Sequence, residues 1–320
     1  MRPSMLGGGV KRGVSGAAYP APMAGPLLAV DAPSLLFRAW FALPDSIKDG
    51  SGRPVNALLG TANLVLFEVA RHAPRAVVLC FGAEAAAYRV DAYPPYHGDR
   101  EDPPDGLAHQ FVDAHRFFAA FGWTSVHDEA LEADDLLGSL ATIEAAAGGR
   151  ALVLTGDRDM YQCASERVTV LYVKTGGSRG AEEVSPDEVR RRYGVEPELV
   201  PDFIALRGDP SDGLPGAKGI GEKTAADLLR RHGSLEGALE HWASEPPRVR
   251  AALREQADEL RTFKNIATLR HLDLPRPRDA PLDTDRAADA ARELGMEQLA
   301  KRLGGWRAVA RLCGPGGSPR

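Results

Sequence analysis

The sequence has few cysteines and no long apolar run. Only 3 of its 320 residues are cysteines, at Cys80, Cys163 and Cys313, and no two form a Cys-x-x-Cys pair. This scarcity argues against a disulfide scaffold or a zinc site, and it is typical of a reducing, cytoplasmic location. No apolar stretch approaches the roughly 20 residues of a membrane span, so we expect no membrane partner.

A large excess of charge of one sign is also missing. The formal net charge is −5, so any surface that binds nucleic acid must be local. With 320 residues and 44% hydrophobic content, the chain is long enough for one large or two modest domains. Residues 1–25 are rich in glycine, proline, serine and alanine, and we expect a disordered lead-in there.

Short apolar runs alternate with amphipathic segments in the first half of the chain. This alternation predicts an α/β fold with a parallel sheet, and the pattern from residue 186 onward predicts an α-helical region. The predicted strands cover 27–30, 76–81, 123–126, 151–154 and 168–173, and the predicted helices cover 34–41, 56–71, 109–121 and 134–147.

Acidic residues follow several predicted strands or begin the next helix. Because ligands bind at the carboxyl ends of parallel strands, we expect these acids to gather at one edge of the sheet. Each acid alone could be a helix cap, but jointly they would repel one another and favour a divalent cation such as Mg²⁺ or Mn²⁺. The candidate metal ligands from this placement are Asp31, Glu132, Asp134, Asp135, Asp157 and Asp159, and a further acidic cluster holds Asp209 and Asp212.

A glycine-rich turn between two predicted helices is the second signal. Gly219-Ile220-Gly221 lies between predicted helices at 200–206 and 223–231. Glycines let a backbone approach a phosphate closely, and helix N-terminal amides bind anions, although an ordinary helix–helix turn is the alternative. The candidate DNA-binding residues are Gly216, Lys218, Gly219, Ile220, Gly221, Lys223 and Thr224.

Four ordered motifs resemble those of the 5′-nuclease family, which includes the 5′–3′ exonuclease domain of bacterial DNA polymerase I and the flap endonucleases. The motifs cover residues 31–39, 131–135, 154–162 and 205–216. The resemblance implies a PIN-like parallel-sheet nuclease core over 26–184, with a helical arch at about 83–118. It also implies a helix-three-turn-helix DNA-binding region over 185–285, followed by a helical extension and frayed tail over 286–320.

The activity implied by this resemblance is that of a stand-alone 5′–3′ exonuclease or flap endonuclease. Such an enzyme hydrolyses phosphodiester bonds at DNA 5′ ends, flaps or RNA primers, with two Mg²⁺ or Mn²⁺ ions in its site. The resemblance implies that Asp209 and Asp212 are also metal ligands and serve the second ion directly or through water. A K⁺ ion at the glycine-rich turn is also implied. The implied catalytic residues are Asp31, Arg89, His97 and Arg100, of which the last three would steer the 5′ phosphate region.

Two positions depart from the family pattern. Gly82 stands where the second strand normally ends in a metal-binding Asp, and His97 stands where the arch normally carries a Lys. These departures leave open a DNA-structure-binding protein of the same family with impaired catalysis. If Gly82 is a deficit, Gly82→Asp should raise activity at limiting metal. A small PIN-type toxin ribonuclease fits less well, because such chains lack the turn at 219–221.

Overall fold

A six-stranded sheet forms the centre of the part of the protein that the computed structural model describes, residues 25–98, 103–174 and 180–312, with side chains to residue 306. Residues 1–24 of the predicted lead-in, the frayed tail from residue 313 onward, and Arg100 lie outside these residues. The strand order is β3-β2-β1-β4-β5-β6. The strands are β1 (Leu27–Asp31), β2 (Ala76–Phe81), β3 (Thr124–His127), β4 (Ala151–Thr155), β5 (Val168–Tyr172) and β6 (Glu182–Val184).

The first five strands are parallel and confirm the predicted strands to within one residue at each end. β6 is the exception, because it pairs antiparallel with β5 and was not predicted. It has only 3 residues, Glu-Glu-Val, and therefore lacks the apolar run that indicates a buried strand.

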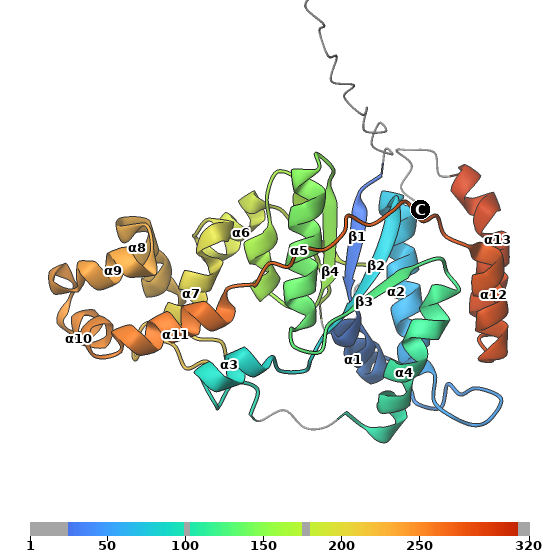
Figure 1. Ribbon diagram of the computed structural model, residues 1–320, viewed down its shortest axis with the longest axis horizontal. Helices are drawn as coiled ribbons and strands as arrows, with labels where there is room; N and C mark the ends of the chain where they lie inside the picture. The colour runs from blue at the N-terminus through green and yellow to red at the C-terminus, as the bar shows by residue number, and fades with distance from the viewer. Residues whose placement is uncertain (1–24, 99–102, 175–179, 313–320) are drawn as a thin grey trace, which may run out of the picture.

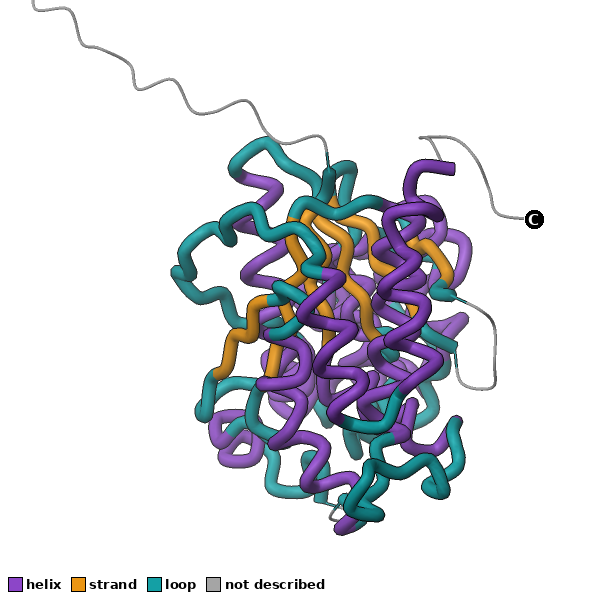
Figure 2. The backbone as a smooth tube through the Cα atoms, turned by 90° about the vertical axis from the view of Figure 1, so that its right-hand side faces the viewer, coloured by secondary structure: helices purple, strands orange, loops and turns teal. Residues whose placement is uncertain are grey.

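Helices cover both faces of the sheet (Figure 2). Side chains alternate along each strand, so Leu28 and Val30 pack into one core while Leu27 and Ala29 pack into the other. α5 (Ala133–Ala146) covers the second of these faces. The first face is covered by α1 (Ala32–Ala42), α2 (Asn56–His72), α4 (Asp105–Ala119), α12 (Thr284–Glu293) and α13 (Glu297–Leu312).

The predicted arch contains two helices, α4 and the shorter α3 (Ala87–Ala92). α4 begins four residues before the predicted start at residue 109. We call residues 83–98 the arch base. Its prolines, at 94 and 95, follow the end of α3 and prevent one continuous helix.

A helical region, residues 186–267, extends away from the sheet at one end of the molecule (Figure 1). Its helical character confirms the prediction made from residue 186 onward. Its α-helices are α6 (Pro186–Tyr193), α7 (Val200–Arg207), α8 (Glu222–His232), α9 (Leu235–Glu240), α10 (Pro247–Glu255) and α11 (Ala257–Ala267). Short 3-10 helices cover Asp159–Cys163 in the core and Pro197–Leu199 and Trp242–Ser244 in the helical region.

An extended segment, residues 268–283, returns the chain from α11 across the core to α12 (Figure 1). We call this segment the strap. It is bound to α5, since Asp135 accepts from Arg270 N at 2.8 Å and Ser139 Oγ accepts from Leu272 N at 2.9 Å. The helical region is therefore connected to the core at both its entry and its exit. None of the described helices combines the length and the hydropathy that a membrane span requires.

Candidate active site

A cavity of about 1180 Å³ lies at the carboxyl ends of the central strands. Three elements of the core contribute carboxylates to its lining: β1 ends in Asp31, α5 begins next to Asp134, and Asp157 follows β4. The loop after α7 adds Asp209 and Asp212 from the helical region. The structure thus brings together acids that are up to 181 residues apart in sequence, from 31 to 212.

Asp31 is both a helix cap and a cavity residue. Its carboxylate accepts from Ser34 N at 3.1 Å and from Thr155 Oγ1 at 2.6 Å, so its orientation is fixed from two sides. Burial raises the pKa of Asp31, and the bonds from Thr155 and Ser34 oppose that rise. The two alternatives for this residue, cap and site, are therefore not exclusive.

Asp157 and Asp159 form a compact pair after β4. Asp157 accepts from Asp159 N at 2.8 Å, and Thr155 Oγ1 accepts from Asp157 N at 2.9 Å. Burial and then the charge of Asp212 raise the pKa of Asp157 to about 7. Asp159 is buried and lies outside the cavity lining, and burial together with the charge of Asp157 holds its pKa well above the usual range.

The three acids at the start of α5 divide into two groups. Asp134 lines the cavity, and within the described residues its side chain makes no hydrogen bond or ion pair. Burial, followed by the charges of Asp157 and Asp31, holds the pKa of Asp134 well above its usual range. Successive helical residues point about 100° apart, so its neighbour Asp135 faces the interior instead.

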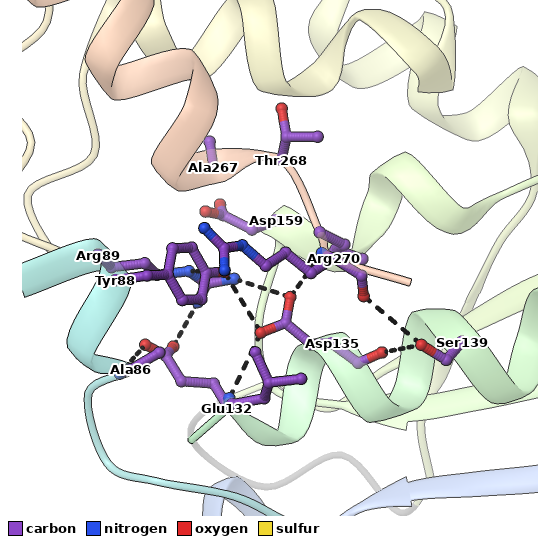
Figure 3. A network of polar contacts seen from close by, with 12 residues as sticks. Ala86, Tyr88, Arg89, Glu132, Asp135, Ser139, Asp159, Ala267, Thr268 and Arg270 are labelled. Carbon is purple, nitrogen blue, oxygen red and sulfur yellow. Dashed lines mark hydrogen bonds and ion pairs between the residues drawn. The ribbon is translucent and has the colours of Figure 1, made fainter. Parts of the chain in front are cut away.

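Glu132 and Asp135 bind an arginine of the arch base (Figure 3). Arg89 donates from Nη1 to Glu132 at 2.5 Å and from Nη2 to Asp135 at 3.2 Å. Asp135 does not line the cavity, whereas Glu132 does, and the other oxygen of Glu132 accepts from Ala86 N at 2.8 Å. Both acids are thus engaged by protein groups in this structure.

Arg89 is placed differently from the expectation that it steers a phosphate. It is only 3% exposed and does not line the cavity, because its side chain extends from the arch base onto the start of α5. This placement carries no local signal, since Arg89 lies in a stretch of sequence without regular apolar periodicity. The geometry favours a role in positioning other groups over direct contact with a phosphate.

His97 lines the cavity and contacts the helical region. Its Nε2 lies 3.0 Å from Asp212 Oδ1, its Nδ1 lies 3.0 Å from the Glu84 carbonyl, and its ring stacks on Tyr96 with centroids 3.9 Å apart. Asp209 shapes the same loop by accepting from Ser211 N at 2.8 Å, and its other oxygen pairs with Arg207 at 3.0 Å. In this structure His97 is therefore paired with a candidate metal ligand.

Gly82 is a packing requirement, contrary to the expectation that it is a simple missing carboxylate. A Cβ placed on Gly82 would lie 2.3 Å from Ala133 N and 2.4 Å from the Glu132 carbonyl carbon. The start of α5 occupies the space that a side chain would need. Gly82→Asp would therefore displace the backbone of α5, and we withdraw the expectation that it raises activity.

The glycine-rich turn joins α7 to α8 as predicted. Gly216 and Gly219 have φ of +67° and +77°, and a Cβ on Gly216 would lie 2.3 Å from Gly208 N. Ile220 is buried and Thr224 is partly buried. Lys218, Gly219, Gly221 and Lys223 are exposed, although Lys218 N already donates to Gln256 at 2.7 Å.

The donor set suits a hard divalent cation, because the cavity-facing acids supply oxygen ligands and raise one another's pKa. Across residues 25–98, 103–174 and 180–312, no three acidic, histidine or cysteine side chains lie close enough together to form a complete ligand set. The cavity, about 1180 Å³ in volume, is large enough to hold water beside the carboxylates that line it.

Sequence reasoning missed several residues of this site. Thr155 binds Asp31 and Asp157, Arg38 donates to the Gly156 carbonyl at 2.6 Å beside them, and Tyr96 OH donates to Glu132 at 3.0 Å. Thr155 and Arg38 lie inside two recognised motifs, so position within a motif was the available signal. Tyr96 directly precedes His97 in the arch motif, so the same kind of signal was available for it.

The comparisons with known proteins agree with this architecture. Residues 26–194 match the family described as 5′-3′ exonuclease, N-terminal resolvase-like domain, and residues 195–287 match the 5′-3′ exonuclease C-terminal SAM fold. DNA polymerase I of Mycobacterium tuberculosis is 39% identical over 229 residues, which make up 71% of this chain and 25% of the polymerase. Thermostable DNA polymerase I of Thermus thermophilus is 36% identical over 264 residues, 82% of this chain and 30% of that one.

Solved structures share the fold at low sequence identity. The T5 5′-exonuclease with bound zinc has a TM-score of 0.61 and 17% identity, over 89% of this chain and 99% of its own. The catalytic core of Rad2 in complex with DNA substrate has a TM-score of 0.58 and 12% identity, over 87% of this chain and 91% of its own. Since the two family domains together match residues 26–287, the chain belongs to the 5′–3′ exonuclease family of nucleases.

Proposed function

We propose that this protein is a divalent-metal-dependent 5′ nuclease that hydrolyses phosphodiester bonds at DNA 5′ ends and flaps, including the ends of RNA primers. The observation that carries the proposal is the convergence of Asp31, Asp134 and Asp157 with Asp209 and Asp212 on one cavity. Carboxylates that raise one another's pKa are stabilised by cations, and a phosphodiester substrate requires the same positive charge.

Divalent ions bound there would activate a water and neutralise charge on the phosphate as it is attacked. Asp31, Asp134 and Asp157 would bind one ion, and Asp209 and Asp212 would bind a second directly or through water. The protein's own contribution is orientation: the Thr155 hydroxyl donates to the Asp31 carboxylate and accepts from Asp157 N, so it fixes both groups. Mg²⁺ and Mn²⁺ are the proposed ions.

The glycine-rich turn is the proposed duplex-binding element. Exposed Lys218 and Lys223 lie on either side of Gly219 and Gly221, where a backbone can approach a phosphate. A K⁺ ion coordinated by carbonyls of this turn is part of the proposal. Contacts of this kind are independent of sequence and weaken with salt.

The relatives support this proposal within limits. The chain spans a quarter to a third of the length of the polymerases it matches, so their polymerase activity is not carried over. The solved relatives are described with divalent metal ions or with DNA substrate, and the same ligand classes are proposed here.

The test is cleavage of a DNA substrate with a 5′ flap. Purified protein would be incubated with the flap in Mn²⁺, in Mg²⁺ or in EDTA, beside Asp157→Ala. We expect metal-dependent release of the flap by the wild type and none by the variant. Binding without cleavage in either metal would overturn the nuclease proposal.

A second candidate function is DNA-structure binding with impaired catalysis. It is favoured by His97, whose ring is bound between Glu84 and Asp212 and replaces a flexible lysine at the cavity. The same assay separates the two functions, because the second predicts a shifted band on a gel and no product.

A further inference from the structure

We propose that Arg89 is a positioning residue that sets the spacing between the two halves of the carboxylate cluster, by joining the arch base to α5 and to the strap. The catalytic measurements that test this proposal rest on the proposed function. The structural role given to Arg89 does not depend on that function. It gives Arg89 and its partners Glu132 and Asp135 a role that does not require them to touch metal or DNA.

The first joint connects the arch base to the core. Arg89 Nη1 and Tyr96 OH both donate to Glu132 Oε2, at 2.5 and 3.0 Å, while Ala86 N donates to Oε1 at 2.8 Å. Both ends of the arch base therefore attach to a single carboxylate at the start of α5. Arg89 Nη1 also lies 3.2 Å from Tyr96 OH, so Arg89, Tyr96 and Glu132 all contact one another.

The second joint connects the same arginine to the strap (Figure 3). Asp135 Oδ1 accepts from Arg89 Nη2 at 3.2 Å and from Arg270 N at 2.8 Å. The Arg270 guanidinium in turn lies 3.2 Å from the centroid of the Tyr88 ring, in the arch base. Arg270 follows α11, so this joint fixes the exit of the helical region.

The third joint reaches the loop after α7. Tyr96, bonded to Glu132, stacks on His97, whose Nε2 lies 3.0 Å from Asp212. A Cβ on Gly213 would lie 2.9 Å from the Pro95 carbonyl, so the two turns are in direct contact. The arch base thus bridges from α5 to the carboxylates of the helical region.

These joints lie between the two carboxylate groups of the cavity. Asp134 sits between Ala133 and Asp135 on α5, while Asp212 lies at the far end of the chain of contacts through Tyr96 and His97. Displacement of Arg89 would let the two groups move relative to one another. A shift of about 1 Å in a catalytic arrangement can lower a rate about a hundredfold.

A matched control exists at the other end of α5. Arg75 donates to both oxygens of Glu144, at 3.2 and 2.5 Å, and to Asp279 of the strap at 2.8 Å. The Arg75 and Glu144 side chains are 3% and 1% exposed, against 4% and 7% for Arg89 and Glu132. Both networks join a buried arginine to a buried carboxylate of the α5 ends, although Glu144 is also bound by Arg276. Arg75 and Glu144 do not line the cavity.

The experiment compares Arg89→Gln, Arg89→Lys and Arg75→Gln in the full chain. Each variant would be measured for Tm, for kcat and KM on the 5′-flap DNA, for the Mn²⁺ concentration giving half the maximal rate, and for amide hydrogen exchange without metal. Arg89→Lys keeps the charge but lacks the fork that reaches two carboxylates. If Arg89→Gln does not fold, Arg89→Lys can be measured in its place.

We expect Arg89→Gln and Arg75→Gln to lower Tm by similar amounts. Arg89→Gln should also lower kcat about tenfold or more with little change in KM, raise the half-saturating Mn²⁺ concentration, and speed exchange at 208–213. Arg89→Lys should show a smaller loss of kcat. Arg75→Gln should change kcat less than about twofold and leave exchange at 208–213 unchanged.

Equal kcat for Arg89→Gln and Arg75→Gln, at a temperature where both are folded, would overturn the proposal. Unchanged exchange at 208–213 in the Arg89 variants would overturn it as well. The exchange measurement needs no catalysis. An inactive wild type would therefore contradict the proposed nuclease, while the exchange data would still decide the role of Arg89.

Discussion

The two ends of α5 use the same ion-pair chemistry for different purposes. At the N-terminal end, Glu132 and Asp135 bind Arg89 and the strap, and at the C-terminal end Glu144 binds Arg75 and the strap. What distinguishes the N-terminal end is Asp134, which has no bonded partner among the described residues and faces the cavity. The difference indicates that the unpaired acid is the one available for chemistry. Its paired neighbours hold the surrounding structure in place.

The largest expected effect comes from removing the unpaired acid. Asp134→Asn should lower metal-dependent cleavage on the order of a thousandfold, because one charge of the cluster is lost. Its metal-free stability should stay level or increase, because repulsion with Asp157 and Asp31 is relieved. Steady-state kinetics and thermal unfolding in EDTA check both, with the exposed Asp289→Asn as control. Activity close to that of wild type would remove Asp134 from the site.

Paired acids at the two ends should behave alike in stability. Glu132→Gln and Glu144→Gln each leave a buried arginine with weakened compensation, so each should lower the free energy of unfolding by about 3 kcal/mol. Urea unfolding measures this. A loss of kcat in Glu132→Gln alone would support the difference between the two ends of α5. Unchanged stability in Glu132→Gln would contradict a shared structural role for the two acids, since it would indicate that Glu132 serves only to bind metal.

Packing at the N-terminal end should tolerate no side chain on Gly82. Gly82→Ala places a Cβ 2.3 Å from Ala133 N, so it should cost about 2 kcal/mol and lower Tm. Gly50→Ala is the matched control, because a Cβ there meets nothing within 4 Å. A neutral Gly82→Ala would mean that α5 can shift at low cost, and it would reopen the case for a carboxylate at this position.

The smallest effect concerns acid stability at the C-terminal end. Despite its burial, hydrogen bonds from Arg276 and Arg75 hold the pKa of Glu144 below its usual value of 4.5. The unfolded chain therefore takes up a proton first, so this contribution is complete above about pH 4.5 and is lost as pH falls through the folded pKa. In EDTA, the stability difference between wild type and Glu144→Gln should shrink below pH 4.5. A difference independent of pH would argue against the ion pair.

Local patterns in the sequence predicted the strands and the grouping of acids, since both depend on short apolar runs and their neighbours. The division of Glu132, Asp134 and Asp135 could not be predicted this way, because it depends on Arg89 and Arg270, 43 and 138 residues from Glu132 in sequence. The short β6 carries no local signal, since it exists only as a partner of β5. The crowding at Gly82 likewise depends on where α5 begins.

The strap gives the helical region the topology of an insertion. Its chain leaves the sheet after β6 and is bound again to α5 at Arg270, so both of its junctions are fixed to the core. A single cut within residues 186–267 would leave both fragments attached to that core. For the same reason, heating should melt the helical region and the sheet in one cooperative transition.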